Sequence, residues 1–246
     1  SLGIPLSVSD NLARFLATQA PPIASSSVIV SPVTPIDISS SIWQTRPAAT
    51  RLTASDWGEI GLLQTPTARM APAGDARLQL SRVTPYTRGS ILLQPLDWLE
   101  AGFRYTDISN RAYGPVFGKD QTYKDKSIDI KVRLREENHL LPQIAFGLRD
   151  LGGTGLFSSE YVVASKRWGN WDASLGIGWG YLGARGNLKN PLSLVASEFA
   201  ARPVVVNGVT GTPSTQIWIH GPSALFGGVQ WQSTESPWTL KLELDG

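Results

Sequence analysis

Three carboxylates near the ends of expected strands, Asp107, Asp150 and Glu160, are the residues best placed for acid–base chemistry. Two carboxyl groups that flank a glycosidic bond can act as acid and base in polysaccharide hydrolysis. The pair Glu136-Glu137 is a poorer candidate, because adjacent residues of a strand point to opposite faces. Loop carboxylates are far more often solvated than catalytic. We therefore expect that the protein is not an enzyme. The alternative is an enzyme that acts on a polysaccharide and uses these carboxylates as acid and base.

Other kinds of catalytic or metal-binding site find little support. Ser158-Ser159 has no histidine nearby that could activate a serine nucleophile. No helix is expected after the glycines of 152–155, so the helix N-terminus of a phosphate-binding loop is lacking. The chain has no cysteine, and its two histidines, His139 and His220, are isolated. We expect no cofactor and no metal.

Charged residues that alternate with apolar ones suggest a second chemistry, the binding of a charged ligand. In the run 127–135 every second residue is Ile, Val or Leu, and those between are Ser, Asp, Lys or Arg. A period of two predicts a strand with one apolar and one charged face. The residues expected to face the lumen of a barrel, where they could contact a charged polymer, are Arg104, Asp129, Lys131, Arg133, Arg135, Arg149, Lys241 and Glu243. Their basic excess would favour an anionic polymer, but we rank a cross-strand ion-pair network above ligand binding.

Many strands are needed to position these charges. Alternating patterns predict strands at 76–81, 89–94, 99–106, 127–135, 143–149, 159–167, 171–181, 225–232 and 238–245. About ten strands with no amphipathic helices between them indicate an antiparallel up-and-down sheet. Short turns at 95–98, 137–142, 169–170 and 234–237 alternate with longer segments at 82–88, 107–126, 150–158 and 182–224. Such alternation is typical of outer-membrane barrels.

Aromatic residues near the strand ends fit the same interpretation. Bilayer-spanning proteins carry tryptophan and tyrosine at both membrane interfaces. The expected interface aromatics on outward faces are Trp98, Trp168, Trp171, Trp179, Tyr181 and Trp238. The alternative is that these rings are buried in the core of a soluble β-sandwich.

Composition narrows the class of protein. Only 17% of residues are charged, and the net charge of +2 argues against nucleic acid as a partner. No stretch of about 18 consecutive apolar residues exists, which excludes a transmembrane helix. Residues 1–56 are rich in Ser and Pro, and we expect an irregular leader or linker with a short helix at 10–19 or an edge strand. The chain lacks an initial Met and a leader, which is consistent with a removed secretion signal or with a fragment.

Several ordered motifs resemble a known family. They are Gly61 to Met70, Leu99 to Thr106, Gln121 to Lys126, Gly147 to Tyr161, Ala164 to Arg167, Gly176 to Gly183 and Leu242 to Gly246. Together they resemble the YjbH/GfcD-type exopolysaccharide-biosynthesis proteins of Gram-negative bacteria, over about residues 57–246. The resemblance implies an outer-membrane β-barrel, often a lipoprotein, that assists secretion or modification of a polysaccharide. It also implies longer proteins with more than one barrel.

Two features depart from the family pattern. There is no cysteine for lipidation, and the chain ends at Asp245-Gly246 without the terminal aromatic of many outer-membrane barrels. We therefore expect this chain to be the N-terminal part of a larger protein. The resemblance supplies no catalytic residue.

The sequence thus predicts an all-β protein with a leader at 1–56 and a transmembrane β-barrel region at 57–246, complete or part of a larger or double barrel. We expect it in the bacterial outer membrane, taking part in exopolysaccharide or capsule secretion as a conduit, scaffold or docking partner. Its expected partners are outer-membrane lipid, the exopolysaccharide and other export proteins. A soluble periplasmic carbohydrate-binding β-sandwich is the main alternative.

Overall fold

A computed structural model of the chain describes residues 51–114, 118, 120–203, 213 and 215–246. The chain divides into two compact units, Ser1–Pro47 and Ala48–Gly246, and the fold below is that of the second. This unit begins upstream of residue 57, where we expected the leader to end. The helix expected at 10–19 lies outside the described residues.

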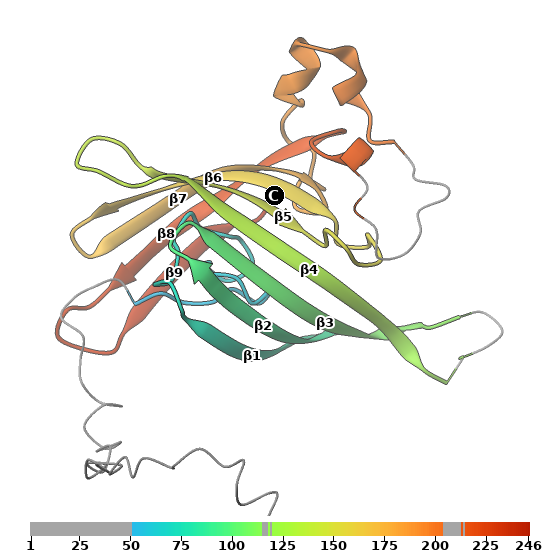
Figure 1. Cartoon of the computed structure of the whole chain (residues 1–246), viewed down its shortest axis with the longest axis horizontal. Helices are drawn as coiled ribbons and strands as arrows, with labels where there is room; N and C mark the ends of the chain where they lie inside the picture. Colours follow the sequence, from blue (N-terminus) through green and yellow to red (C-terminus); the bar gives the residue numbers. More distant parts are fainter. Residues whose placement is uncertain (1–50, 115–117, 119, 204–212, 214) are drawn as a thin grey trace, which may run out of the picture. The chain divides into compact units, whose positions relative to one another are not determined.

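Nine strands form one antiparallel sheet whose order in space follows the order in the sequence (Figure 1). They are β1 (Ala76–Val83), β2 (Tyr86–Leu96), β3 (Leu99–Ala112), β4 (Thr122–Arg135), β5 (Gln143–Arg149), β6 (Ser159–Trp168), β7 (Trp171–Gly180), β8 (Ser223–Gln232) and β9 (Thr239–Leu244). Three short 3-10 helices, η1 (Pro191–Leu194), η2 (Ser197–Ala200) and η3 (Thr215–Ile217), lie between β7 and β8. Each segment expected to be a strand is one, so the all-β up-and-down arrangement is confirmed.

Two expectations about the sheet are not confirmed. The strand count among the described residues is nine, where about ten were expected. The sheet is open, because its order runs from β1 to β9 without pairing these two strands to each other. Closure into a barrel is therefore absent from the described part of the chain.

The connections also differ from the strict alternation of short and long. Residues 82–88 were expected to form one of the longer connections. Instead β1 and β2 pair as far as Val83 and Tyr86, and only Thr84-Pro85 remains as a tight turn. Much of 107–126 likewise belongs to the extended hairpin of β3 and β4, since Thr106 and Asp107 still pair with β4. Among the described residues, no helix is long and apolar enough to span a membrane.

The two faces of the sheet are opposite in polarity to those of an ordinary soluble protein. On one face, here the outer face, large apolar side chains are exposed: Leu78 by 83%, Leu175 by 64% and Leu242 by 73%. On the other, the inner face, Arg104 and Lys131 are only 1% and 2% exposed. A sandwich would bury the apolar face against a second sheet, but the described residues form a single sheet.

The inner face is covered by residues 51–71, here called the inner segment, which precede β1 and are drawn in blue in Figure 1. Side chains from every strand contact it through hydrogen bonds or, for Arg104, through the ring of Trp57. The contacting strand residues include Gln79, Ser81, Arg88, Arg104, Lys131, Gln143, Arg149, Ser165, Asp172, Gln230, Lys241 and Glu243. The nine strands thus share one internal partner.

Apolar contacts follow the same plan. Three buried clusters contain Ala68, Trp57 and Ile60 respectively, and each of these residues comes from the inner segment. In the first cluster Ala68 packs with residues of β5, β6 and β8, among them Tyr161 and Phe226. The core therefore lies between the inner segment and the sheet, and it is small and mixed with charge.

Candidate functional site

A tight turn of the inner segment carries two carboxylates to the inner face. Residues 56–59, here called the acidic turn, have the sequence Asp-Trp-Gly-Glu. The turn is closed by the amide of Gly58, which donates to the carbonyl of Ser55 at 3.0 Å, and by the amide of Ser55, which donates to the carbonyl of Glu59 at 2.8 Å. Gly58 has φ +96°, and a Cβ there would lie 2.5 Å from the Cβ of Ser90 on β2. Only glycine lets this turn approach the sheet so closely.

Four ion pairs surround the acidic turn. Two join the turn to the sheet: Asp56 pairs with Arg88 of β2, and Glu59 pairs with Arg149 of β5. Two lie within the sheet: Lys131 Nζ is 2.9 Å from Glu100 Oε1, and Arg104 Nη2 is 3.2 Å from Asp129 Oδ1. The side chains of all eight residues are at most about one tenth exposed. Buried charges of this kind are tolerated only when they are paired.

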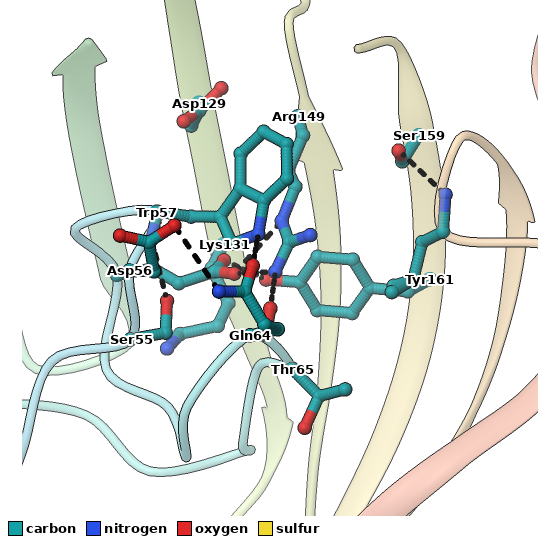
Figure 2. Close-up of polar contacts among 12 residues, drawn as sticks. Ser55, Asp56, Trp57, Gln64, Thr65, Asp129, Lys131, Arg149, Ser159 and Tyr161 are labelled. Atoms are coloured by element: carbon teal, nitrogen blue, oxygen red, sulfur yellow. Dashed lines mark hydrogen bonds and ion pairs between the residues drawn. The ribbon is translucent and has the colours of Figure 1, made fainter. Parts of the chain in front are cut away.

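Trp57 stands between the two carboxylates of the turn and is surrounded by guanidinium groups. The guanidinium carbons of Arg88, Arg104 and Arg149 lie 4.3, 4.6 and 4.8 Å from the centre of its ring. Its indole N–H donates to Gln64 Oε1 at 3.1 Å, as Figure 2 shows. Three cations around one ring are mutually repulsive, so the carboxylates and the ring together keep them in place.

Glu59 is the best connected carboxylate of the cluster. Its Oε1 accepts from Nε of Arg149 at 2.9 Å, and its Oε2 accepts from the hydroxyl of Tyr161 at 2.7 Å. Burial alone would raise the pKa of Glu59. The charges of Arg149 and Lys131 and the hydrogen bonds from Arg149 and Tyr161 outweigh burial and lower that pKa. The group is therefore held as a carboxylate.

A glycine makes room for Tyr161. Gly147 of β5 lies directly opposite Tyr161 of β6, and a Cβ on Gly147 would come within 2.1 Å of the phenol ring. The ring therefore lies across the neighbouring strand and extends to the acidic turn. The same device recurs at Gly176, where a Cβ would meet the ring of Phe226 at 2.3 Å.

The eight charged residues expected to face a lumen divide into three groups. Arg104, Asp129, Lys131 and Arg149 belong to the ion-pair cluster. Lys241 and Glu243 of β9 instead hold the backbone of the inner segment: Lys241 Nζ donates to the carbonyl of Leu62 at 2.7 Å, and Glu243 accepts from the amides of residues 63–65.

The last two expected residues, Arg133 and Arg135, take no part in the cluster. Arg133 pairs with Glu136 at 2.7 Å. Arg135 is exposed, because the register between β4 and β5 shifts between these two arginines and ends the alternation. Contact of any of the eight residues with a polysaccharide stays a prediction.

The carboxylates considered for acid–base chemistry have separate partners. Asp107 is bound by Lys124 and Thr122 on β4. The carboxylate of Glu160 accepts hydrogen bonds from both Nη groups of Arg202 at 2.8 Å and from the amide of Ile219 at 3.0 Å.

Asp150 lies in the loop between β5 and β6, where its Oδ2 accepts from the amide of Phe157 at 3.1 Å. Burial and the nearby charge of Asp125 raise the pKa of Asp150 to about 7. Among the described residues, Oδ1 of Asp150 and Oδ2 of Asp125 have no hydrogen-bond partner.

The expected interface aromatics divide as well. Trp98, Trp168, Trp171 and Trp238 are exposed, at the sheet end that carries the turns β2–β3, β6–β7 and β8–β9. Trp179 is only 5% exposed, which corrects its expected outward exposure. The expected outward direction of Tyr181 also needs correction. Tyr181 follows Gly180, whose φ of +66° breaks the alternation, and the centres of the Tyr181 and Trp57 rings are 5.5 Å apart on the inner side.

Sequence reasoning missed half of the ion-pair cluster, namely Asp56, Glu59, Arg88 and Glu100. Asp56 was assigned to the leader and Arg88 to a loop, because neither has alternating neighbours of its own. Glu100 could have been found, since it has the same parity as Arg104 in β3.

Comparison with known proteins gives two matches and one negative result. The family model described as "Exopolysaccharide biosynthesis protein YbjH" matches residues 53–246. The chain is 48% identical over 205 residues to the protein named "Uncharacterized lipoprotein YjbH" of Escherichia coli (strain K12), a match that covers 82% of this chain and 29% of that protein. The chain thus spans less than a third of that relative's length. No solved structure matches the chain.

Proposed function

Because the chain belongs to the exopolysaccharide biosynthesis family YbjH, we propose that it forms part of an outer-membrane β-barrel wall that takes part in exopolysaccharide export. The family resemblance expected from the motifs is thereby confirmed. In this proposal the chain is a conduit, scaffold or docking partner and has no catalytic role. The relative from Escherichia coli is named a lipoprotein, which supports the proposal that this chain is associated with a membrane.

The observation that carries the proposal is the inverted polarity of the sheet. Leu78, Leu175 and Leu242 lie on β1, β7 and β9, and each is mostly exposed on the outer face. Exposed apolar area of this extent is unfavourable in water, at about 25 cal/mol per Å². Lipid removes that cost, because a membrane barrel presents apolar residues outward and polar residues inward.

The exposed tryptophans support the same orientation. Trp98, Trp171 and Trp238 lie beside connections at one end of the sheet. Indole rings favour the membrane–water interface, where the ring contacts lipid and the N–H reaches water or a headgroup. That end of the sheet would lie at the periplasmic interface, where turns are short in outer-membrane barrels.

The open edges are compatible with a barrel wall completed by further chain. A sheet edge in lipid would leave backbone groups without hydrogen bonds, so both β1 and β9 would need partners. The chain spans 29% of its relative, and we propose that the remaining part of such a longer protein supplies them.

The test introduces single cysteines into this chain, which contains none, within the full-length protein, and the protein without an introduced cysteine gives the background labelling. Cysteine at Ile128 or Leu175, on the outer face in the middle of β4 and β7, is expected to resist a water-soluble maleimide in isolated outer membranes. Cysteine at Asn138, in an exposed connection, is the matched control and should react fully. Release of the protein into buffer without detergent, or equal labelling at all three positions, would contradict the proposal.

A further inference from the structure

We infer that the inner face of β2–β5 holds a binding site for a carboxylate-bearing saccharide, and that the acidic turn occupies this site in the present structure. The inference rests on the proposed role in polysaccharide export, to which it adds a ligand class. It is carried by the charge balance of the cluster, by the geometry around Trp57 and by hydrogen-bond donors that lack partners.

The strand residues of the four ion pairs are not neutral among themselves. The strands contribute four cations and two carboxylates to the cluster, which are Arg88, Arg104, Lys131, Arg149, Glu100 and Asp129. Four positive and two negative charges leave an excess of +2. Asp56 and Glu59 of the acidic turn neutralise this excess. If the turn left, Arg88 and Arg149 would lose their carboxylate partners and require another anion.

Two more carboxyls lie near the cluster without changing this balance at the turn. Asp125 and Asp150 are held by the loop between β5 and β6, through Thr154 and the amide of Phe157. Their link to the cluster is the amide of Asp150, which donates to Asp129 at 2.8 Å. Neither carboxyl pairs with Arg88 or Arg149 among the described residues.

The acidic turn has the chemical layout of an acidic sugar. A flat apolar ring, Trp57, lies between two carboxylates, and guanidinium groups contact both the ring and the carboxylates. Arginine recognises carboxylates strongly through charge-assisted hydrogen bonds. The hydroxyl of Tyr161 adds a directional hydrogen bond to one carboxylate oxygen. A uronic acid unit offers a carboxylate for the same arginines and hydroxyl oxygens as further acceptors, although its aliphatic ring lacks the cation–π attraction of Trp57.

Hydrogen-bond donors without partners are the third observation on the inner face. Nε of Arg88 and both Nε and Nη1 of Arg104 are buried without a hydrogen-bond partner in the described part of the chain. Buried donors without partners are uncommon, and each of these could donate to a water or to a ligand oxygen. Arg104 borders a small cavity of about 10 Å³ that is also lined by Trp57 and Glu100. A saccharide replacing the turn could accept from these donors through its hydroxyl and carboxylate oxygens.

One glycine substitution can weaken the turn without changing any charge. In the full-length protein in detergent, Gly58→Ala puts a Cβ against Ser90 at a φ of +96° and should displace the turn. Gly74→Ala is the matched control, because Gly74 also has a positive φ, of +85°, but meets nothing within 4 Å. Binding is measured by calorimetry with a galacturonic acid trimer, a neutral maltotriose and a glutamate tripeptide.

The expected result is tighter binding of the galacturonic acid trimer to Gly58→Ala than to Gly74→Ala, by about tenfold or more, because a competing occupant lowers apparent affinity. Maltotriose should not bind, and Gly58→Ala/Arg149→Gln should lose the gain. Equal affinity of the two glycine variants for the trimer would overturn the inference. Equal binding of the glutamate tripeptide would also overturn it, since the site would then recognise acidic peptides.

A second variant tests the site without the glycine substitution. Asp56→Asn/Glu59→Gln removes both carboxylates of the turn, and the trimer should raise its unfolding temperature while leaving that of the unchanged protein nearly constant. Absence of this difference contradicts the inference. The cysteine labelling described above reports separately on the membrane, so protected outer-face cysteines without trimer binding would refute only the saccharide site.

Discussion

The ion pair between Glu59 and Arg149 is expected to be the main electrostatic link between the inner segment and the sheet. Both side chains are nearly inaccessible to solvent, with 6% and 1% exposure. Replacing either residue alone leaves the charge of the other buried without its partner, whereas replacing both removes both charges of the pair. The informative experiment is therefore a double-mutant cycle with Glu59→Gln, Arg149→Met and the double variant.

The structure allows the magnitudes to be ordered. Glu59→Gln leaves Arg149 without its carboxylate, and breaking a buried pair in this way costs about 3–5 kcal/mol of unfolding free energy. Arg149→Met should lower the unfolding free energy by less, about 3 kcal/mol, because Tyr161 still donates to Glu59 and the charge of Lys131 still acts on Glu59. The double variant should cost less than the sum of the two by at least about 1 kcal/mol.

Unfolding by urea in detergent micelles, followed by tryptophan fluorescence, measures these losses. Glu136→Gln is a suitable control, since Glu136 is largely exposed in its pair with Arg133 and should contribute less than about 1 kcal/mol. Additive losses within about 0.5 kcal/mol would refute the reasoning, because independent sites add and coupled ones do not.

Three further outcomes are expected. Asp150→Asn should raise the unfolding temperature at pH 8 but not at pH 4. Because the pKa of Asp150 is raised from 3.8 to about 7, the native state retains a proton that the unfolded state releases between these two pH values. The stability of the unchanged protein therefore falls as pH rises from 3.8 to about 7. Gly147→Ala should lower the unfolding temperature by several degrees, since its Cβ would overlap the ring of Tyr161, and Gly147→Ala/Tyr161→Leu should recover part of the loss. Glu160→Gln should lower the unfolding temperature, because it removes the buried carboxylate that accepts from Arg202 and from the amide of Ile219; an unchanged unfolding temperature would contradict this expectation.

The strands were predictable because their pattern is local. In the run 127–135 the alternation of side chains depends only on neighbouring residues, and β4 covers the whole run. The turn at Thr84-Pro85 was missed for the opposite reason. Arg82, Thr87 and Arg88 do not alternate in polarity, yet Arg82 and Thr87 pair across the hairpin.

The site was only half predictable because its two halves are set by different interactions. Arg104, Lys131 and Arg149 share one face through strand periodicity, which sequence reasoning captures. Asp56 and Glu59 reach that face through a glycine turn and through contacts with residues far away in the chain. No local pattern encodes such contacts, so this segment was interpreted as a leader and its edge.

The position of the inner segment before β1 determines when it can reach its partners during folding. Each hairpin of the sheet joins strands adjacent in the sequence, so the sheet can grow one strand at a time as the chain emerges. Glu243, which binds the amides of Leu63 and Gln64, is about 180 residues further along the chain. Residues 51–71 are therefore synthesised before every strand but acquire their full set of contacts only after β9 has formed, so the first part of this unit to be made is the last to be fixed in place.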